Sequence, residues 1–364
     1  MTLGTLISAS VASLICTTAA FSGGAVVDGT LDAAYSGANV VQDTQTGFGN
    51  SDIGLPDFAN GSELDAGHSL IEGGHLYIML PGNLESTFNK VDIFIDAIDG
   101  GQHTLRNDNP DVDFDGLNRM GDDGSGENGL TFDAGFDADM WVSMTCGGEV
   151  FATYANYAEL RTLGAGFGTY IGEGTSGADG VIFGKTGMML ALNNSNTGGV
   201  GFGEGLGCGE GVTTGIEIAI PLYLFDFEGS GVDITSAKIC AFINNGGHDY
   251  MSNQVLGGLS GSGNLGDPRY VNFEGIGGQQ YFTVGDVAGP CPDPTGACCL
   301  DVECSDLSDA ECLALGGEYN GDGTFCNGNP PPCAPESCQG DVNGDGIVDV
   351  ADILIVIGNW GCIQ

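Results

Sequence analysis

Basic residues are scarce in this sequence. Lysine and arginine together number 7 against 49 aspartates and glutamates, the formal net charge is −42, and no basic residue follows Arg269. Binding to the phosphates of nucleic acid needs a cationic surface, so this composition excludes nucleic acid as a partner and disfavours an anionic membrane surface. The acidity indicates divalent-cation binding and solubility in a salty exterior, or simply a highly solvated surface.

Long apolar runs and histidines are also few. Beyond residue 20 no apolar run reaches the roughly 18 residues that span a bilayer, so no membrane span is expected. The 4 histidines do not stand in the context of a catalytic triad, and Gly258–Ser262 breaks the Gly-x-Ser-x-Gly pattern at its last position. Among 49 carboxylates, a pair suited to glycoside hydrolysis carries no information. The sequence therefore predicts a non-catalytic protein, with an atypical glycan-active enzyme as the alternative.

The first 20 residues are mostly apolar or small and end at a small-residue cleavage site after Ala20. They resemble a secretory signal peptide that lacks its basic n-region, and a buried first helix is the alternative. We therefore expect residues 1–20 to be a signal peptide and the protein to be secreted, either extracellular or at the cell surface.

Cysteines are concentrated near the C-terminus. Of the twelve that remain apart from Cys16, nine lie between Cys291 and Cys362. This density behind an export-like N-terminus indicates disulfides, whereas zinc is disfavoured because no histidine follows His248. Residues 288–336 are predicted to be a cysteine-rich spacer module, and its six cysteines from Cys298 to Cys333 allow fifteen pairings. Cysteines elsewhere that can form two more bridges are Cys146, Cys208, Cys240 and Cys291.

Residues 21–287 consist of short apolar runs separated by glycine-rich turns, and the whole chain has 66 glycines. These runs predict strands, while helical periodicity is almost absent. Many strands with glycine-rich loops predict a mainly β fold, an antiparallel β-sandwich of jelly-roll or immunoglobulin-like type. A disordered glycine-rich surface protein is the alternative. The predicted strands are 76–79, 91–95, 140–144, 150–154, 216–220, 239–243 and 281–284.

The segment 341–352 places oxygen-bearing side chains at positions 1, 3, 5, 9 and 12 of a twelve-residue loop. This is the ligand spacing of a calcium loop, with glycine at position 6 where the backbone turns sharply. A solvated acidic turn is the alternative. The predicted Ca²⁺ ligands are Asp341, Asn343, Asp345, the Ile347 carbonyl, Asp349 and Asp352. The residues predicted to form one buried face of a following short helix are Ile353, Val356, Ile357 and Trp360.

Residues 340–361 resemble one repeat of a type I dockerin, in which a calcium loop leads into a helix and the twelfth loop position is Asp. Upstream, only the fragment 320–323 is similar. The resemblance implies that residues 337–364 form a calcium-binding module that attaches to a cohesin-like or cell-surface scaffold protein, and it links the chain to polysaccharide breakdown. Cys338 and Cys362 flank the module, and we expect them to pair in place of the missing second repeat.

Four landmarks spread over residues 25–285 resemble those of family 9 carbohydrate-binding modules and related DOMON-like sandwiches. The landmarks are 27–35, 74–78, 91–96 and 217–221. In those modules aromatic side chains clasp a sugar, because an aromatic ring packs on the C–H bonds of a pyranose. The chain has two tryptophans: Trp360 is assigned to the tail helix, and Trp141, in the middle of a strand, is expected to pack in the core. The resemblance therefore implies the fold and leaves the sugar site open.

A second acidic cluster mimics the spacing of the C-terminal calcium loop. Its candidate metal ligands are Asp111, Asp113, Asp115 and Asp122. It differs from a calcium loop because Asn118 replaces the apolar anchor and Arg119 puts a cation at position 9. A calcium ion held by a loop of the sandwich is one interpretation, and a solvated loop is the other.

Together these features predict a secreted, non-catalytic modular protein with Ca²⁺ as its cofactor. We expect a carbohydrate-binding or attachment component linked to extracellular polysaccharide metabolism, with polysaccharide as a partner. A structural protein of the cell envelope or the extracellular matrix is the alternative.

Overall fold

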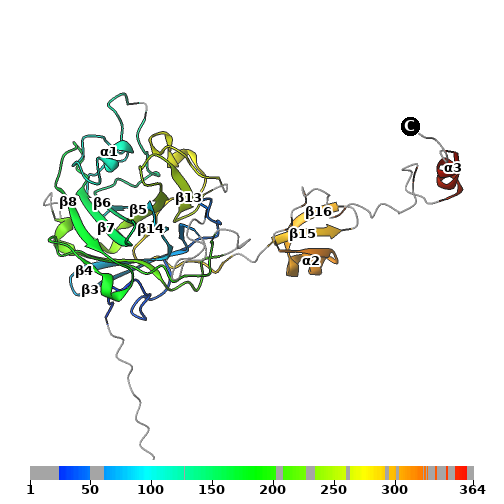
Figure 1. Ribbon diagram of the computed structural model, residues 1–364, viewed down its shortest axis with the longest axis horizontal. Helices are drawn as coiled ribbons and strands as arrows, with labels where there is room; N and C mark the ends of the chain where they lie inside the picture. Colours follow the sequence, from blue (N-terminus) through cyan, green and yellow to red (C-terminus); the bar gives the residue numbers. More distant parts are fainter. Residues whose placement is uncertain are drawn as a thin grey trace, which may run out of the picture.

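The computed structural model (Figure 1) describes residues 24–49, 61–126, 128–201, 208–226, 234–259, 263–291, 295–300, 303–322, 324, 326, 333, 342 and 349–358. The predicted signal peptide, residues 1–20, lies outside the described residues. Other predicted functional residues that lie outside them are Cys338, Asp341, Asn343, Asp345, Ile347, Trp360 and Cys362.

Two antiparallel sheets of seven strands each dominate the described residues. The strands of the first sheet are, in spatial order, β1 (Val40–Val41), β3 (Ala66–Glu72), β4 (His75–Asn83), β11 (Gly215–Pro221), β10 (Met189–Leu192) and β9 (Ile182–Phe183), with β2 (Glu63–Leu64) beside β4. The strands of the second sheet are β13 (Met251–Val255), β12 (Lys238–Asn244), β5 (Thr87–Asp96), β6 (Met140–Gly147), β7 (Ala152–Glu159) and β8 (Gly168–Gly174), with β14 (Phe282–Thr283) beside β12. The prediction of a mainly β, antiparallel architecture is confirmed.

Each of the seven predicted strands overlaps an observed one. They correspond to β4, β5, β6, β7, β11, β12 and β14. Some strands that were not predicted are two residues long, as in β1, and others lack a continuous apolar run, as in β8 and β13, whereas β10 is a short apolar strand that the prediction missed. Short 3₁₀ helices also occur, at Ala178–Gly180, Leu222–Phe225, Ile234–Ser236, Pro268–Tyr270 and Phe273–Gly275.

The largest core cluster takes side chains from both sheets. In β5, Ile93 and Ile95 belong to it, and so do Ile78 of β4 and Ile218 of β11. Successive residues of a strand point to opposite faces, so Phe94 between the two isoleucines faces away from this cluster. The second sheet therefore buries apolar side chains on both of its faces.

The outer face of the second sheet is partly covered by two long connections. The connection 97–139 contains the short helix α1 (Gly116–Arg119) and contributes buried residues such as Leu105 and Phe132 to a second cluster. The segment 256–281 contributes Phe273. In Figure 1, α1 lies on the side of β5–β7 that is opposite to β3 and β4. These connections do not fill one end of the outer face, which holds an open cavity.

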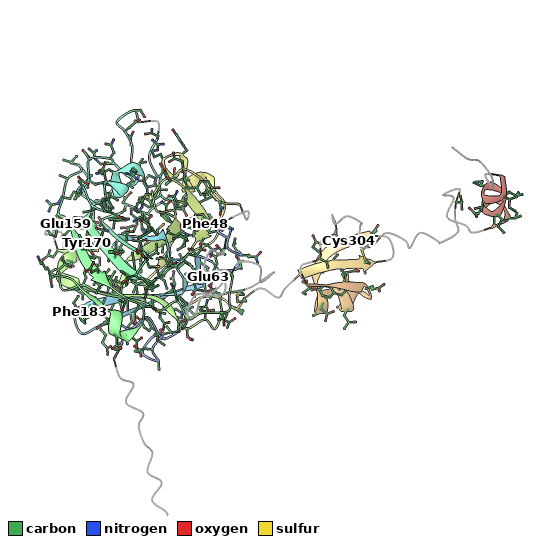
Figure 2. All side chains as sticks on the ribbon, viewed as in Figure 1. Phe48, Glu63, Glu159, Tyr170, Phe183 and Cys304 are labelled. Carbon is green, nitrogen blue, oxygen red and sulfur yellow. A yellow bond between two sulfur atoms is a disulfide. The ribbon has the colours of Figure 1, made fainter. Side chains whose placement is uncertain are left out.

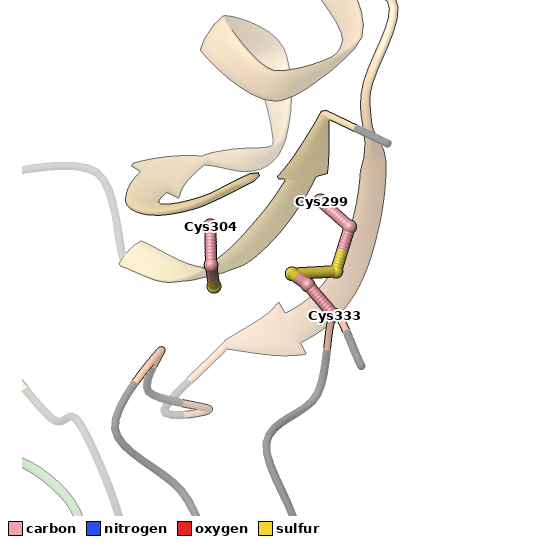
Figure 3. Close-up of side chains that lie close together, drawn as sticks. All are labelled: Cys299, Cys304 and Cys333. Carbon is pink, nitrogen blue, oxygen red and sulfur yellow. A yellow bond between two sulfur atoms is a disulfide. The ribbon is translucent and has the colours of Figure 1, made fainter. Parts of the chain in front are cut away.

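The cysteine-rich segment forms a small unit of its own. β15 (Thr295–Leu300) pairs with β16 (Glu303–Ser308) on one side and β17 (Glu318–Asp322) on the other, and α2 (Asp309–Leu315) follows β16. Ser308 and Glu311 form a capping box at the start of α2. The six central cysteines pair among themselves, as Cys298–Cys312, Cys299–Cys333 and Cys304–Cys326. Figure 3 shows the Cys299–Cys333 bond beside Cys304.

The other four cysteines form one disulfide, where the sequence allowed two. Cys208 pairs with Cys291, so the chain remains tied to the first sheet region up to residue 291, beyond the predicted boundary at 287. Cys146 and Cys240 are buried and cannot reach each other. The reason is that Cys146 faces the cluster shared by both sheets while Cys240 faces the cluster on the outer side.

Near the C-terminus, α3 (Val350–Gly358) occupies the place of the predicted tail helix. Its apolar residues Ile353, Val356 and Ile357 are about half exposed, at 56%, 46% and 58%. The prediction that these residues form a buried face is therefore wrong. In the described part of the chain, no element packs against this side of α3. None of the helices in the described part of the chain has both the length and the apolar character that crossing a bilayer requires.

Candidate functional site

The uncovered end of the outer face holds a cavity of about 660 Å³, which we call the aromatic cleft. Four aromatic side chains line it: Phe88, Phe114, Tyr154 and Tyr170. The polar side chains that line it are Lys90, Asp113, Thr145 and Asn156. The two phenylalanines and Tyr170 are 44%, 91% and 51% exposed. Single exposed apolar side chains are common on protein surfaces, whereas several large exposed rings around one cavity indicate a binding site.

Strand register places the cleft residues side by side. In one cross-strand row Lys90 of β5 lies opposite Thr145 of β6, which lies opposite Tyr154 of β7. In the next row Asn156 of β7 lies opposite Tyr170 of β8. Because side chains two residues apart share a face, both rows point outward, away from the inter-sheet core. Alternation along β5–β8 thus builds the floor of the cleft from four strands.

The backbone around the cleft is unusual. In the part of the chain that the structure describes, five of the six non-glycine residues with positive φ line the cleft or lie next to it: Phe88, Asp113, Phe114, Asp115 and His248, with φ between 49° and 68°. Phe88 stands where the register of β5 against β6 shifts, which marks a bulge. Left-handed backbone costs bulky residues about 1–3 kcal/mol each, and such strain clusters at ligand sites. The concentration of strain here supports a functional role for this cleft.

A buried charge network lies beneath the cleft. Nε2 of His248 is 2.8 Å from Asp113 Oδ2, and its Nδ1 is 3.1 Å from Asp92 Oδ2. Lys90 Nζ contacts the same Asp113 oxygen at 2.7 Å, and both side chains are about 5% exposed. Trp141 Nε1 donates to Asp92 Oδ1 at 3.0 Å. Removing one partner from such a network leaves an uncompensated buried charge, which is strongly destabilising.

The network shifts the acidities of its members. Burial alone would lower the pKa of His248, but the charge of Asp92 and the hydrogen bond to Asp113 outweigh it and raise the pKa above its usual value. Burial opposes ionisation of Asp113, yet its hydrogen bond to His248 and the charge of Lys90 hold its pKa below the usual range. At the floor of the cleft, the positive charges of His248 and Lys90 and the negative charge of Asp113 therefore stabilise one another.

The four carboxylates of the second acidic cluster do not come within metal-binding distance of one another among the described residues. Asp113 is engaged by Lys90 and His248. Asp115 accepts a hydrogen bond from Asn118, and Asp122 accepts from backbone N–H groups of its own turn. Asp111 is exposed. Asp113, Asp115 and Asp122 thus have separate partners, because α1 lies inside the segment and turns the chain, whereas the calcium-loop pattern assumes a single continuous loop.

Two of the predicted tail ligands are described, and both act at the start of α3. The Asp349 carboxylate accepts from the Ala351 N–H at 2.7 Å. The Asp352 carboxylate, 2% exposed, accepts from the N–H of Asp349 at 2.8 Å and from that of Val342 at 2.7 Å. Asp349 thus caps the start of α3 through the N–H of Ala351, and Asp352 binds back to the N–H of Asp349. Carboxylate oxygens suit a hard cation such as Ca²⁺, and the negative charge of these two side chains also stabilises the N-terminus of α3.

Among the described residues, a single group of three ligand-type side chains comes within metal-binding distance: Cys299, Cys304 and Cys333. All three sulfur atoms belong to disulfides, so the group is a place where two bridges pass close together. The expectation of disulfides in this module is confirmed.

The first and last of the four landmark segments meet in space. The Glu217 carboxylate of β11 accepts from the backbone N–H of Asp28 at 2.9 Å and of Gly29 at 3.1 Å, and from the Tyr35 hydroxyl at 2.9 Å. Burial raises the pKa of Glu217 to about 7, against the opposing effect of these donors. Glu217 thus fastens the N-terminal segment onto the first sheet, which is a structural role.

Trp141 packs fully buried in the outer cluster, as expected. Apart from Asp113, the cleft residues were not predicted, because the two tryptophans were the aromatic residues considered for a sugar site. Two signals in the sequence point toward them. Tyr154 and Asn156 alternate with apolar residues along β7, and Lys90 is one of only 7 basic residues yet stands within an apolar strand.

Comparison with known proteins adds no family. No family model matches the chain, and no curated protein or solved structure matches it either.

Proposed function

We propose that this chain is a non-catalytic glycan-binding protein, in which a two-layer antiparallel β-sandwich carries the aromatic cleft as its ligand site. The observation that carries the proposal is the grouping of four aromatic and four polar side chains around one cavity of about 660 Å³. Small-molecule sites span roughly 300–1,000 Å³ and combine apolar walls with a few polar groups. Pyranose rings match this pattern, because their C–H faces pack on aromatic rings while their hydroxyls form hydrogen bonds.

A binding role is favoured over hydrolysis by the acidic groups of the cleft. Glycosidases use two carboxyl groups that flank the scissile bond. Among the described residues that line the cleft, Asp113 alone is acidic, and its carboxylate is engaged by Lys90 and His248. A carboxylate held in this way suits hydrogen bonding to a sugar hydroxyl better than nucleophilic attack or proton transfer.

We further propose that the protein is secreted and that its tail, residues 337–364, binds Ca²⁺ and attaches the chain to a scaffold protein. Four disulfides in the described residues support an oxidising compartment. The tail proposal is supported by the ligand spacing of the segment 341–352 and by the position of Asp349 and Asp352 at the start of α3. In this arrangement the cysteine-rich module is a spacer between glycan-binding and attachment parts.

The glycan proposal is tested by binding of the full chain to insoluble polysaccharides and to a glycan array. The diagnostic variant is Phe114→Ala, which removes the most exposed ring of the cleft. The matched control is Phe183→Ala, because Phe183 is 73% exposed but lies on β9 of the other sheet, where Figure 2 labels it.

We expect the wild-type protein and the control to bind the same glycans and the Phe114 variant to lose most of that binding. Loss of binding in both variants, or in neither, would place the glycan outside the cleft. If no glycan binds to any of the three proteins, a structural role in the cell envelope or the extracellular matrix is favoured instead.

A further inference from the structure

His248 lies between two carboxylates under the cleft, at hydrogen-bonding distance from each. Its Nδ1 is 3.1 Å from Asp92 and its Nε2 is 2.8 Å from Asp113. A neutral imidazole has one N–H and therefore donates only once, whereas an imidazolium donates from both nitrogens. Asp92 also accepts from Trp141 and Asn244, as an ionised carboxylate does. Both carboxylates are satisfied when His248 carries both ring protons, whereas a neutral ring can donate to only one of them.

The turn that carries Phe114 rests on this imidazolium. Asp113, Phe114 and Asp115 all have left-handed backbone, with φ of 49°, 55° and 67°. Gly116 follows directly over the His248 ring, and a Cβ added at Gly116 would collide with ring atoms. Three consecutive strained residues persist only when their surroundings hold them in place. The ion pairs of Asp113 with His248 and Lys90 supply that hold.

We propose that His248 is a positioning residue of the aromatic cleft, whose doubly protonated ring holds Asp113 and thereby Phe114 in the ligand-binding position, so that ligand binding weakens when the ring loses a proton. This inference rests on the proposed glycan-binding function. It adds a dependence on pH to that site.

The charged and titratable groups around His248 come from several elements. Asp92 and Lys90 belong to β5, and Asp113 belongs to the turn before α1. Arg119 of α1 donates to the backbone carbonyls of Gly247 and Phe114. Asp249, next to His248 in the chain, is bound by the side chain of Asn245. The two carboxylates in direct contact favour the imidazolium, and Lys90 opposes it.

The sign of the effect follows from these contacts. When the ring loses the proton on Nε2, a lone pair faces the Asp113 carboxylate at the present 2.8 Å, and the attraction becomes repulsion. Asp113 then keeps Lys90 alone, and the strained turn is free to relax. The pKa of His248 is raised, so the change occurs above the ordinary histidine range, as the pH rises.

The test begins without a ligand. The Trp141 ring centroid is 5.9 Å from that of His248, and an imidazolium quenches indole fluorescence, so Trp141 reports the protonation state. In the full chain carrying Trp360→Phe, we expect fluorescence to rise with pH around a midpoint above about 6.5. The additional His248→Asn change, which suits left-handed backbone, should abolish this transition. A transition below pH 6.5, or one that persists without His248, would overturn the proposal.

Hydrogen exchange of residues 113–121, corrected for its intrinsic pH dependence, is the second readout. We expect protection in the wild type to fall roughly tenfold above the fluorescence midpoint, and to be low at every pH in the His248 variant. Should that variant fail to fold, Asp113→Asn replaces it, and we expect it to shift the midpoint downward. An unchanged midpoint in this second variant would also contradict the proposal.

Ligand binding separates this inference from the proposed function. Xylohexaose, cellohexaose and mannohexaose serve as probes, together with any glycan retained in the array, each measured at pH 6 and pH 9. Weaker binding at pH 9 in the wild type alone supports the positioning role. Binding that is equal at both pH values overturns the positioning role but leaves the glycan site intact. If no glycan binds while Trp141 titrates as expected, the proposed function fails instead.

Discussion

Replacement of Glu217 by glutamine is expected to remove a large part of the pH dependence of stability. Glu217 is fully buried on β11, and burial raises the pKa of its carboxyl to about 7 from the ordinary 4.5. A carboxyl with a raised native pKa binds its proton more tightly when folded, so its stabilising contribution is complete below pH 4.5 and is lost as the pH rises to 7. Each pKa unit corresponds to 1.36 kcal/mol, so the change amounts to at most about 3 kcal/mol.

Glutamine has no proton to lose but keeps an oxygen that accepts from the N–H groups of Asp28 and Gly29. We therefore expect the difference in free energy of unfolding, Glu217→Gln minus wild type, to increase by up to about 3 kcal/mol between pH 5 and pH 8. Denaturant unfolding followed by circular dichroism at each pH, in 0.5 M NaCl to screen the net charge, measures this difference. Asp65 and His248 also titrate with raised pKa values, but they are present in both proteins and cancel.

The control for this experiment is Glu149→Gln, because Glu149 is exposed in the turn between β6 and β7. It removes one negative charge without touching a buried carboxyl, so its stability should follow the wild-type pH profile. If the stabilities of Glu217→Gln and the wild type also change in parallel from pH 5 to pH 8, burial of Glu217 is not the origin of the pH dependence.

Two further predictions concern the C-terminal modules. Ser308→Ala breaks the capping box of α2, and we expect hydrogen exchange of α2 to show a loss of about 1 kcal/mol in the stability of the cysteine-rich module. The control Ser305→Ala, on the exposed part of β16, should cause no such loss. Equal effects of the two changes would show that the cap contributes nothing. For the tail, calorimetric titration of the full chain with Ca²⁺ should show binding that Asp341→Ala and Asp345→Ala each abolish or greatly weaken, and unchanged affinity in both variants would remove these residues from the ligand set.

Strand identity was predictable where apolar residues recur at every second position of a short segment. Val91–Ile95 and Ile216–Ile220 have this alternation, and they form the centres of β5 and β11. Strand β13, with the sequence Met-Ser-Asn-Gln-Val, is fully buried although it is largely polar, because its amides bond to neighbouring loops. Such burial depends on partners more than 200 residues away, which a local pattern does not contain.

The site was less predictable than the fold for a related reason. Lys90, Asp113 and His248 lie far apart in the sequence, and only the pairing of β5 with β12 and the turn before α1 bring them together. The spacing of the acidic residues in 111–122 predicted metal ligands, whereas in the structure Asp113 forms ion pairs with Lys90 and His248. Disulfide pairing in the cysteine-rich module was likewise open among fifteen possibilities until the fold selected one.

Isothermal titration of the best-retained glycan into the full chain, with Tyr170→Ala compared to Tyr270→Ala, tests most directly whether the aromatic cleft is the glycan site. Both tyrosines are exposed, at 51% and 70%, but Tyr270 lies outside the cleft and its ring faces Arg269. Burying an aromatic side chain against a sugar is worth roughly 1.5–3 kcal/mol, which corresponds to a ten- to hundredfold change in affinity. We predict a loss of this size for Tyr170→Ala and none for Tyr270→Ala. Equal affinity of the two variants and the wild type would contradict the assignment.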